Sequence, residues 1–285
     1  MNVVILGNGY ISGHLSKLLS EANSVTVCSR SMMDYGDKYE LTKFLTHLHA
    51  EIVICAFGFT GKPNIDEAED KKSLCWQLNV IDPLVVNTVC SDLDIAFCTV
   101  SSGCIYNGYE KTWEKEDSSN FGLFHESSFY SKSKHAFETV TSHLPGTVIR
   151  IRLPFSGCSS SRNYLQKLLG YPSLIDMRNS RTSVHDLCSV VDASLEMMVD
   201  ERSKIRRTMQ VVNHDPLTTR EVLDLMRSHG FSRDDWRFIP LDNLPAKAPR
   251  SNCLLQVDAG PFGSLINTEM VAMEKSLRLM AQNIK

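Results

Sequence analysis

Three side chains of the sequence have the types and the order that a carbonyl reduction requires. Tyr130 and Lys134 are spaced i, i+4, so a helix would place them on one face, one turn apart. The phenol of a tyrosine has a reference pKa of about 10, and a nearby ammonium group favours its ionised form. Ser102 lies upstream by the distance that a strand-to-helix crossover spans. Together they predict proton transfer to or from a substrate oxygen, although Tyr-x-x-x-Lys alone is common by chance.

A cysteine stands close to this serine. Ser102 and Cys104 are spaced i, i+2 at the end of an apolar run, and in an extended segment both side chains point to the same side. A thiol, with a reference pKa of about 8.5, can act as an acid or a base beside a cation. From position alone, a cysteine without a chemical role is an equally good interpretation.

The remaining cysteines predict neither disulfides nor a metal. The nine cysteines are scattered, contain no Cys-x-x-Cys pair, and several stand in apolar strand-like runs. This is typical of buried free thiols in a reducing compartment. The histidines add no metal-ligand spacing, so we expect no metal site.

A glycine-rich turn follows the first apolar run. Residues 3–6 lead into Gly7-Asn8-Gly9-Tyr10-Ile11-Ser12-Gly13 and then into a helical pattern. Glycines at such a junction let the backbone approach a pyrophosphate held at the helix N-terminus. The turn therefore predicts a dinucleotide site, with an ordinary tight turn as the alternative. Its expected cofactor contacts are Gly7, Gly9, Tyr10, Ile11 and Gly13, whereas Ser12 takes the usual third-glycine position.

The end of the second apolar run indicates which dinucleotide is bound. No acidic residue stands there to bind a ribose 2′-hydroxyl, and the chain instead reads Cys28-Ser29-Arg30. A guanidinium group suits a 2′-phosphate, so Arg30 favours NADPH. A solvated loop arginine is the competing interpretation, and NADH remains compatible.

The hydrophobic pattern predicts the elements that hold these residues. Short apolar runs alternate with helical patterns in the first half, with strands at 3–6, 25–28, 52–57, 95–100 and 148–153 and helices at 11–21, 40–50, 72–91 and 127–143. Unbroken apolar strands are those buried on both faces, so we expect a parallel sheet covered by helices. The later part is less regular, with helices at 163–169, 184–199, 218–229 and 268–282 and a strand at 209–212.

The predicted fold class is α/β, a doubly wound Rossmann-type parallel sheet with a smaller irregular α/β substrate lobe. We expect residues 1–155 to form the NADP-binding domain and residues 156–285 the substrate lobe, with part of 183–215 returning to the first domain. Thr218 and Glu221 form a plausible capping box for the helix that follows them.

The composition of the chain argues against two classes of partner, nucleic acids and membranes. The 285 residues are 42% hydrophobic and 22% charged with a net charge of −3, as in ordinary globular proteins. No basic excess exists to neutralise phosphates, so nucleic acid is not an expected partner. No apolar run approaches the ~18 residues of a membrane span, and the N-terminus lacks the basic region of a signal peptide. We therefore expect a cytoplasmic protein that has no contact with a membrane.

Longer stretches of the chain resemble one family. Within the extended short-chain dehydrogenase/reductases, the chain is similar to the bifunctional 3,5-epimerase/4-reductases of UDP-rhamnose synthesis, known as part of plant rhamnose synthase. The resemblance rests on AFGFTGKPNIDEAED (56–70), LNV (78–80), SSGCIY (101–106), SFYSKSKHAFE (128–138), IRIRLPF (149–155), SRNYLQKLL (161–169) and APRSN (248–252). These stretches cover nearly the whole chain. The glycine turn is a residue shorter than in the plant enzymes, and residues 107–126 differ.

The resemblance implies a role for particular residues. It assigns reduction to Ser102, Tyr130 and Lys134 and epimerisation to an acid/base pair, Cys104 and Lys167. Along the cofactor cleft it places Ala56, Phe57, Gly58, Asn79 and Lys134, and toward the substrate Asn163 and Arg250. Asn163 and Lys167 are spaced i, i+4, so one helix face could present both to the sugar. Lys134 would also hold the cofactor ribose and keep the pKa of Tyr130 low.

The implied substrate is a UDP-linked 4-keto-6-deoxy sugar, and the implied product is UDP-L-rhamnose. A homodimer through residues 72–91 and 127–143 is typical of the superfamily. The alternatives are a simple 4-keto-sugar reductase, of the dTDP-rhamnose or GDP-fucose synthase type, and a non-catalytic NADP-binding regulatory subunit. A 4,6-dehydratase fits poorly because Gly103-Cys104 stand where that family has Asp-Glu. Both UDP and dTDP are compatible with the sequence.

Overall fold

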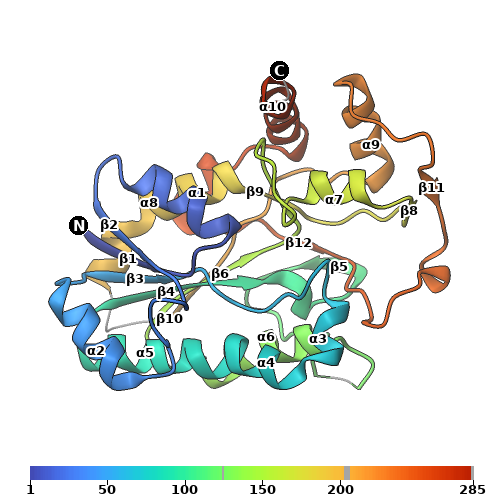
Figure 1. The fold of residues 1–285 in the computed structure, drawn as a ribbon. Helices are drawn as coiled ribbons and strands as arrows, with labels where there is room; N and C mark the ends of the chain where they lie inside the picture. The colour runs from blue at the N-terminus through green and yellow to red at the C-terminus, as the bar shows by residue number, and fades with distance from the viewer. Residues whose placement is uncertain (124, 202–205, 284–285) are drawn as a thin grey trace.

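A six-stranded parallel sheet forms the centre of the computed structural model, which describes residues 1–123, 125–201 and 206–283 (Figure 1). The order of the strands is β10-β6-β4-β3-β1-β2, and every neighbouring pair is parallel. The strands are β1 (Asn2–Leu6), β2 (Ser24–Cys28), β3 (Ile52–Cys55), β4 (Ala96–Ser102), β6 (Gly146–Ile151) and β10 (Arg206–Gln210). The predicted doubly wound α/β fold is confirmed.

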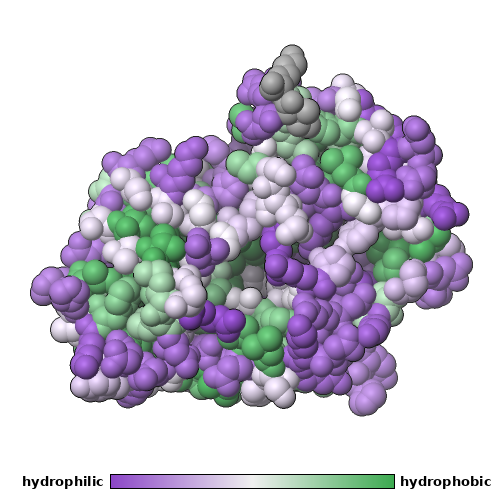
Figure 2. Space-filling view, in the orientation of Figure 1, coloured by the Kyte–Doolittle hydropathy of each residue, from purple (hydrophilic) through white to green (hydrophobic). Residues whose placement is uncertain are grey.

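Helices cover both faces of the sheet because its strands are apolar on both sides. In β1, Val3 and Ile5 pack into one core, and Val4 and Leu6 pack into the other. The first core is closed by α1 (Tyr10–Leu19) and α8 (Val184–Asp200). The second is closed by α2 (Lys38–His47), α5 (Asp82–Asp92) and α6 (Phe129–Val140), which lie below the sheet in Figure 1. On the outside, the face of the molecule seen in Figure 1 carries hydrophilic residues mixed with hydrophobic ones (Figure 2).

The topology decides where a ligand can enter. After β1 the chain adds β2 on one side and then crosses back to place β3 on the other side of β1. In open α/β sheets, ligands bind outside the carboxyl ends of the strands at such a reversal. Gly7 follows β1, Ala56 follows β3, and Ser102 ends β4. The predicted cofactor and catalytic residues therefore meet at one edge of the sheet.

The second half of the chain builds a smaller lobe with a core of its own. Its helices are α7 (Tyr164–Gly170), α9 (Thr219–Ser228) and α10 (Glu269–Gln282), seen above the sheet in Figure 1. Short parallel pairs connect its loops: β7 (Pro154–Phe155) with β9 (Thr182–Ser183), β8 (Ser173–Leu174) with β11 (Arg237–Phe238), and β5 (Gly108–Trp113) with β12 (Cys253–Leu255). Short 3₁₀ turns occupy Gly103–Ile105, Leu241–Asn243 and Gly260–Leu265. At α9, Thr218 and Glu221 form the predicted capping box.

Three local features differ from the expectations. The single helix predicted over 72–91 is α4 (Lys72–Trp76), a π-helical segment (Gln77–Ile81) and α5, preceded by α3 (Asp66–Asp70). The acidic α3 has no apolar face that a pattern could reveal. Part of the segment 107–126 is β5, and the strand expected at 209–212 is β10, which starts earlier because its backbone pairs with β6 from Gly146 onward.

A buried ion pair connects segments of the smaller lobe. Arg181 donates to the Glu269 carboxylate at 2.6 Å, and both side chains are completely buried. Arg181 also donates to the carbonyl oxygen of Leu217 (2.7 Å) and to the Tyr164 hydroxyl (3.1 Å). The pair therefore joins the start of β9 to α7 and to the beginning of α10.

We expect Arg181→Met to lower the free energy of unfolding by about 3–5 kcal/mol, because it leaves the Glu269 carboxylate buried without its partner. The double variant Arg181→Met/Glu269→Leu removes both charges and should lose much less. Urea denaturation of the parent, single and double variants measures the difference. A double variant as unstable as the single one would contradict this explanation.

Candidate active site

The turn after β1 forms a cradle that requires glycine. Gly7 has a φ of +112°, and a Cβ there would lie 3.0 Å from the backbone nitrogen of Phe57 and 3.1 Å from the carbonyl carbon of Ala56. The backbone of the turn thus lies directly against the segment that follows β3. This is the close approach, at the start of a ten-residue helix, that a pyrophosphate site needs.

Ser12 explains the irregular glycine pattern. Its hydroxyl accepts from the Gly9 N–H at 2.6 Å and donates to the Gly9 carbonyl oxygen at 3.0 Å. The side chain is completely buried, so a serine closes the turn where the usual pattern has a glycine. Tyr10 donates to the Ser156 hydroxyl at 2.7 Å, which links the turn to the segment after β7.

Arg30 lies two residues after the end of β2 and is exposed. Tyr35 is buried and donates to the Cys28 carbonyl oxygen at 2.6 Å. The centroid of its ring lies 4.6 Å from the ring centroid of Phe57. Arg30 lies close enough to Tyr35 and Asp82 to act on both electrostatically. Burial raises the pKa of Asp82 even though Arg30 opposes the shift.

We expect Arg30→Ala to raise the KM for NADPH about tenfold, the cost of one exposed charge-assisted contact to the 2′-phosphate. The KM for NADH should stay unchanged because NADH lacks that phosphate. Steady-state kinetics with both cofactors measures the two values. Equal use of the two cofactors by the unmutated protein would contradict a role for Arg30 in selecting NADPH.

The structure brings Ser102, Tyr130 and Lys134 together. Ser102 ends β4, and α6 carries the other two residues after the N-cap Ser128, whose hydroxyl accepts from the Ser131 N–H at 3.1 Å. All three residues are at most 8% exposed, and the Tyr130 and Ser102 side chains are hydrogen-bonded. This is the arrangement that carbonyl reduction requires.

The protonation of Tyr130 differs from the expectation. We predicted that Lys134 keeps the pKa of Tyr130 low, but burial raises it, and Cys104 adds to the effect while the Ser102 hydrogen bond opposes it. Burial likewise lowers the pKa of Lys134. The prediction was wrong in direction because desolvation by burial is the largest effect on Tyr130, and it outweighs the opposing effects of Ser102 and Arg162. Tyr130 therefore holds its proton at neutral pH, which suits a proton donor.

The π-helical segment positions the loop after β3. Asn79 accepts from the Phe59 N–H at 2.8 Å and donates to the Phe59 carbonyl oxygen at 3.0 Å and to the Ser133 hydroxyl at 2.9 Å. A Cβ at Gly58 would lie 2.9 Å from the Asn79 amide oxygen and 3.4 Å from the Lys134 Nζ. A side chain at Gly58 would therefore crowd the Asn79 amide and contact the Lys134 ammonium.

Cys104 lies beside the reduction residues and is partly exposed, whereas most of the other cysteines are buried and Cys158 is exposed. Its N–H donates to the Ser102 hydroxyl at 3.2 Å, and its side chain packs near Tyr130. A cation faces the thiol, since Nη1 of Arg152 lies 3.5 Å from Sγ. Both conditions for an acid/base role, a partly open thiol and a neighbouring cation, are present.

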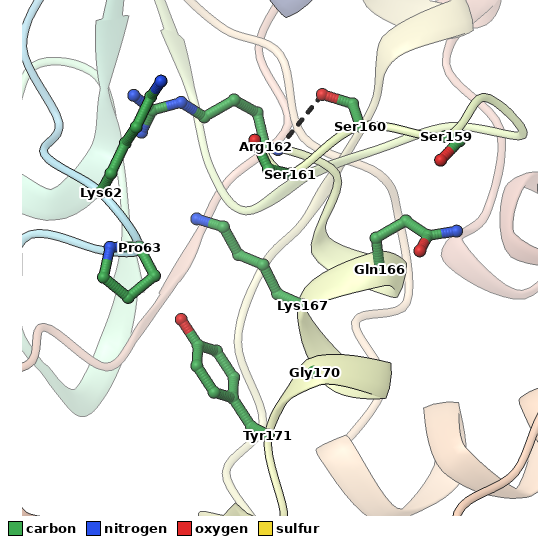
Figure 3. Close-up of a pocket in the computed structure, with 10 residues that line it drawn as sticks. All are labelled: Lys62, Pro63, Ser159, Ser160, Ser161, Arg162, Gln166, Lys167, Gly170 and Tyr171. Carbon is green, nitrogen blue, oxygen red and sulfur yellow. Dashed lines mark hydrogen bonds between the residues drawn. The ribbon is translucent and has the colours of Figure 1, made fainter.

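Lys167 points into a cavity of about 630 Å³ between the loop 59–63 and α7 (Figure 3). The cavity is lined by Lys62, Pro63, Ser159, Ser160, Ser161, Arg162, Gln166, Lys167, Gly170 and Tyr171. Burial lowers the pKa of Lys167, and Arg162 and Arg250 lower it further. A lysine in this state exchanges its proton more readily near neutral pH than an exposed one.

Two predicted substrate contacts are engaged elsewhere in the protein. Asn163 is the N-cap of α7, completely buried, and its amide donates to the carbonyl oxygens of Ser156 (2.7 Å) and Cys158 (2.8 Å). Its side chain therefore holds the start of the helix and the segment before it and is not open to a ligand beside Lys167, contrary to the expectation. Arg250 donates to the Asp66 carboxylate at 2.9 and 3.1 Å, and although burial opposes it, these bonds lower the pKa of Asp66.

Sequence reasoning assigned no role to Arg152 or Arg162. Arg162 donates to the Thr60 hydroxyl and the Gly61 carbonyl oxygen, which holds the loop against the cavity. Arg152 stands in the apolar run 148–153, where a charged residue needs partners once the strand is buried. A charged residue inside this apolar run was the feature of the sequence that could have indicated a role for Arg152.

A family model described as the RmlD substrate binding domain matches residues 1–253. The bifunctional dTDP-4-dehydrorhamnose 3,5-epimerase/dTDP-4-dehydrorhamnose reductase of Arabidopsis thaliana is 27% identical over 264 residues, covering 88% of this chain and 83% of the relative. A trifunctional UDP-glucose 4,6-dehydratase/UDP-4-keto-6-deoxy-D-glucose 3,5-epimerase/UDP-4-keto-L-rhamnose-reductase of the same plant is 26% identical over 256 residues. This match covers 86% of the chain but only 37% of that longer relative.

Solved structures share the fold along nearly the whole chain. The UDP-rhamnose synthase from Acanthamoeba polyphaga mimivirus superposes with a TM-score of 0.84 at 22% identity, covering 98% of this chain and 99% of the neighbour. A dTDP-4-dehydrorhamnose reductase from Bacillus anthracis, solved in complex with NADP, has a TM-score of 0.81 at 16% identity, with coverages of 99% and 98%. The resemblance expected from the sequence is confirmed.

Proposed function

This chain belongs to the RmlD substrate-binding-domain family, and from that membership we propose an NADPH-dependent 4-reductase of sugar nucleotides that is also a 3,5-epimerase. The proposed reaction converts UDP-4-keto-6-deoxy-D-glucose to UDP-L-rhamnose. Reduction of a 4-keto sugar nucleotide is typical of the family. The epimerase activity and the UDP substrate are more specific claims that go beyond family membership.

One observation carries the proposal. Two further acid/base groups accompany the reduction residues: Cys104 packs beside Tyr130, and Lys167 lines a cavity together with Arg162, which acts electrostatically on both Lys167 and Tyr130. Simple reduction needs a proton donor for one oxygen. The additional thiol and amine are groups that a reaction at the neighbouring carbons would require.

Reduction follows from the residues around Ser102. NADPH, with NADH as the other possible carrier, supplies a hydride to sugar carbon 4 when it is bound. Tyr130 gives its phenolic proton to the carbonyl oxygen, and Ser102 holds that oxygen by a hydrogen bond. Lys134, next to Gly58, would hold the cofactor ribose, and Gly7 and Gly9 would hold the pyrophosphate. The NADP bound to the Bacillus anthracis neighbour supports this cofactor.

Epimerisation uses the same ketone. A carbonyl group at position 4 acidifies the hydrogens at positions 3 and 5, so a base can remove each as a proton. Ser102 and Tyr130 stabilise the enolate oxygen by hydrogen bonding. Returning each proton to the opposite face of the ring inverts both centres, and we propose Cys104 and Lys167 as the pair that moves these protons.

A simple 4-keto-sugar reductase is the second candidate, and the family match favours it because the model is named after a reductase type. A non-catalytic NADP-binding subunit is less consistent with the assembled Ser102, Tyr130 and Lys134.

We further propose a division of the chain into residues 1–155 and 156–285, with α8 and β10 returning to the central sheet. We also propose that the protein is a cytoplasmic homodimer. No helix among the described residues has the length and apolar character to cross a membrane.

The test is identification of the product. The protein is incubated with NADPH and either the UDP- or the dTDP-linked 4-keto-6-deoxyglucose, and the hexose is identified by NMR. Formation of the L-rhamnose nucleotide supports both activities. Formation of the uninverted 6-deoxyhexose alone would leave a simple reductase, and no NADPH consumption with either ketone would overturn the proposal.

A further inference from the structure

Arg152 carries a buried positive charge whose partners are neutral. It is 2% exposed, and Nη1 donates to the Ser251 hydroxyl (3.0 Å) and the Cys104 sulfur (3.5 Å). Nη2 donates to the amide oxygen of Asn179 (2.7 Å) and the carbonyl oxygen of Ser251 (2.6 Å). Within the described residues, Arg152 has no ion pair with a carboxylate, and its Nε has no hydrogen-bond partner.

Other buried arginines are paired differently. Arg150, two positions earlier in β6, donates to the Glu138 carboxylate at 2.8 and 2.9 Å, and Arg181 pairs with Glu269. Burying a guanidinium group without a carboxylate costs free energy, because neutral acceptors replace water only in part. The positive field of Arg152 is therefore left uncompensated, and the sulfur of Cys104 lies within that field.

We propose that Arg152 is a positioning residue that stabilises negative charge on the Cys104 sulfur, so that this thiolate accepts a proton from the sugar. The inference rests on the proposed epimerase activity. In that step the sulfur takes the proton from a carbon next to the ketone and becomes a thiol. The electron pair of the broken C–H bond moves into the enolate, whose oxygen is held by Ser102 and Tyr130. A guanidinium beside a thiol favours the anionic sulfur.

The other groups around Cys104 do not replace this role. Tyr130, Lys134 and Cys253 lie close enough to interact with it electrostatically. Burial raises the pKa values of Tyr130 and Cys253, so both are neutral near pH 7. Lys134 is a second cation, but burial lowers its pKa and it also interacts with Glu138. Arg152 is the cation with a direct contact to the sulfur.

Cys158 provides an internal reference for measuring the reactivity of Cys104. Iodoacetamide reacts with thiolates, and Cys158 is exposed, so the alkylation rates of Cys104 and Cys158 can be compared in one sample by peptide mass spectrometry. At pH 7, we expect Arg152→Gln to lower the Cys104/Cys158 rate ratio about tenfold or more. Arg152→Lys keeps a cation and should restore most of the ratio, which a purely structural role would not explain.

A second variant tests the charge without removing the arginine. Asn179→Asp is nearly isosteric and places a carboxylate on Nη2, so it should neutralise Arg152 and also lower the ratio. Ser251→Ala is the matched control, because it removes a neutral acceptor and leaves the charge, and it should keep the parent ratio. If Arg152→Gln does not fold, the alkylation ratio of Asn179→Asp tests the role of Arg152 by itself. A parent-like ratio in Asn179→Asp would overturn the inference.

Alkylation needs no substrate, so the inference and the proposed function can fail separately. Deuterium exchange at sugar positions 3 and 5 in D₂O without NADPH reports epimerisation. An unmutated protein that exchanges no deuterium would overturn the epimerase, and with it the proton transfer to Cys104. A lowered alkylation ratio in Asn179→Asp together with slowed exchange would support both.

Discussion

Tyr130→Phe is expected to lower the rate of NADPH oxidation with a 4-keto sugar nucleotide by about 10²–10⁴-fold, the usual cost of losing a general acid. The variant keeps the ring and loses the hydroxyl that is hydrogen-bonded to Ser102. Because burial raises the pKa of Tyr130, the phenol is protonated at neutral pH in the unmutated protein, which suits its proposed role as the donor. NADPH binding should survive, since the glycine turn is unchanged.

The loss of NADPH absorbance over time measures the rate of NADPH oxidation, and fluorescence titration measures NADPH binding. Tyr39→Phe is the matched control, because Tyr39 is 66% exposed on α2 and the same hydroxyl is removed there. It should retain the parent rate. Normal NADPH oxidation by Tyr130→Phe would show that α6 does not present the proton donor. Hydrogen exchange at positions 3 and 5 should persist in part, since the proposed hydrogen bond from Ser102 to the substrate oxygen is unaffected.

Cys104→Ser and Lys167→Met are each expected to slow deuterium incorporation at sugar position 3 or 5 by about 10²–10⁴-fold. A serine hydroxyl is close in shape to a thiol but far weaker as an acid, and Met keeps most of the lysine stem without its ammonium. Both variants should still bind NADPH. They should also reduce a ketone that is already inverted at positions 3 and 5, because only the earlier proton transfers are lost.

Incorporation is read by NMR or mass after incubation in D₂O without NADPH. Cys158→Ser and Lys275→Met make the same changes at exposed positions and should exchange at the parent rate. If Cys104→Ser incorporates deuterium at both positions as fast as the parent, the thiol has no part in epimerisation. The chain would then be a simple 4-ketoreductase, with Tyr130 still as its proton donor.

Much of the fold could be predicted from local patterns because its causes are local. The apolar run 3–6 alternates between two cores, and a single strand period is enough to predict burial on both faces. The positive φ of Gly7 in the turn and the capping box at Thr218 are also local features, whereas the close approach of Phe57 to Gly7 is not. The π-helical segment around Asn79 escaped prediction because its geometry depends on bonds to Phe59 and Ser133.

The candidate site divides in the same way. Spacing by itself determined that Tyr130 and Lys134 share a helix face and that Ser102 ends a strand. The extended segment expected through Cys104 was wrong, because Gly103–Ile105 form a 3₁₀ turn that Ser102 caps. Only the tertiary structure decided the charge around them. Arg152 meets a cysteine 48 positions earlier and a serine 99 positions later in the chain, and burial sets the direction of the Tyr130 pKa. Desolvation and Coulomb interactions depend on every element packed around a group, and so they are defined only after the chain has folded.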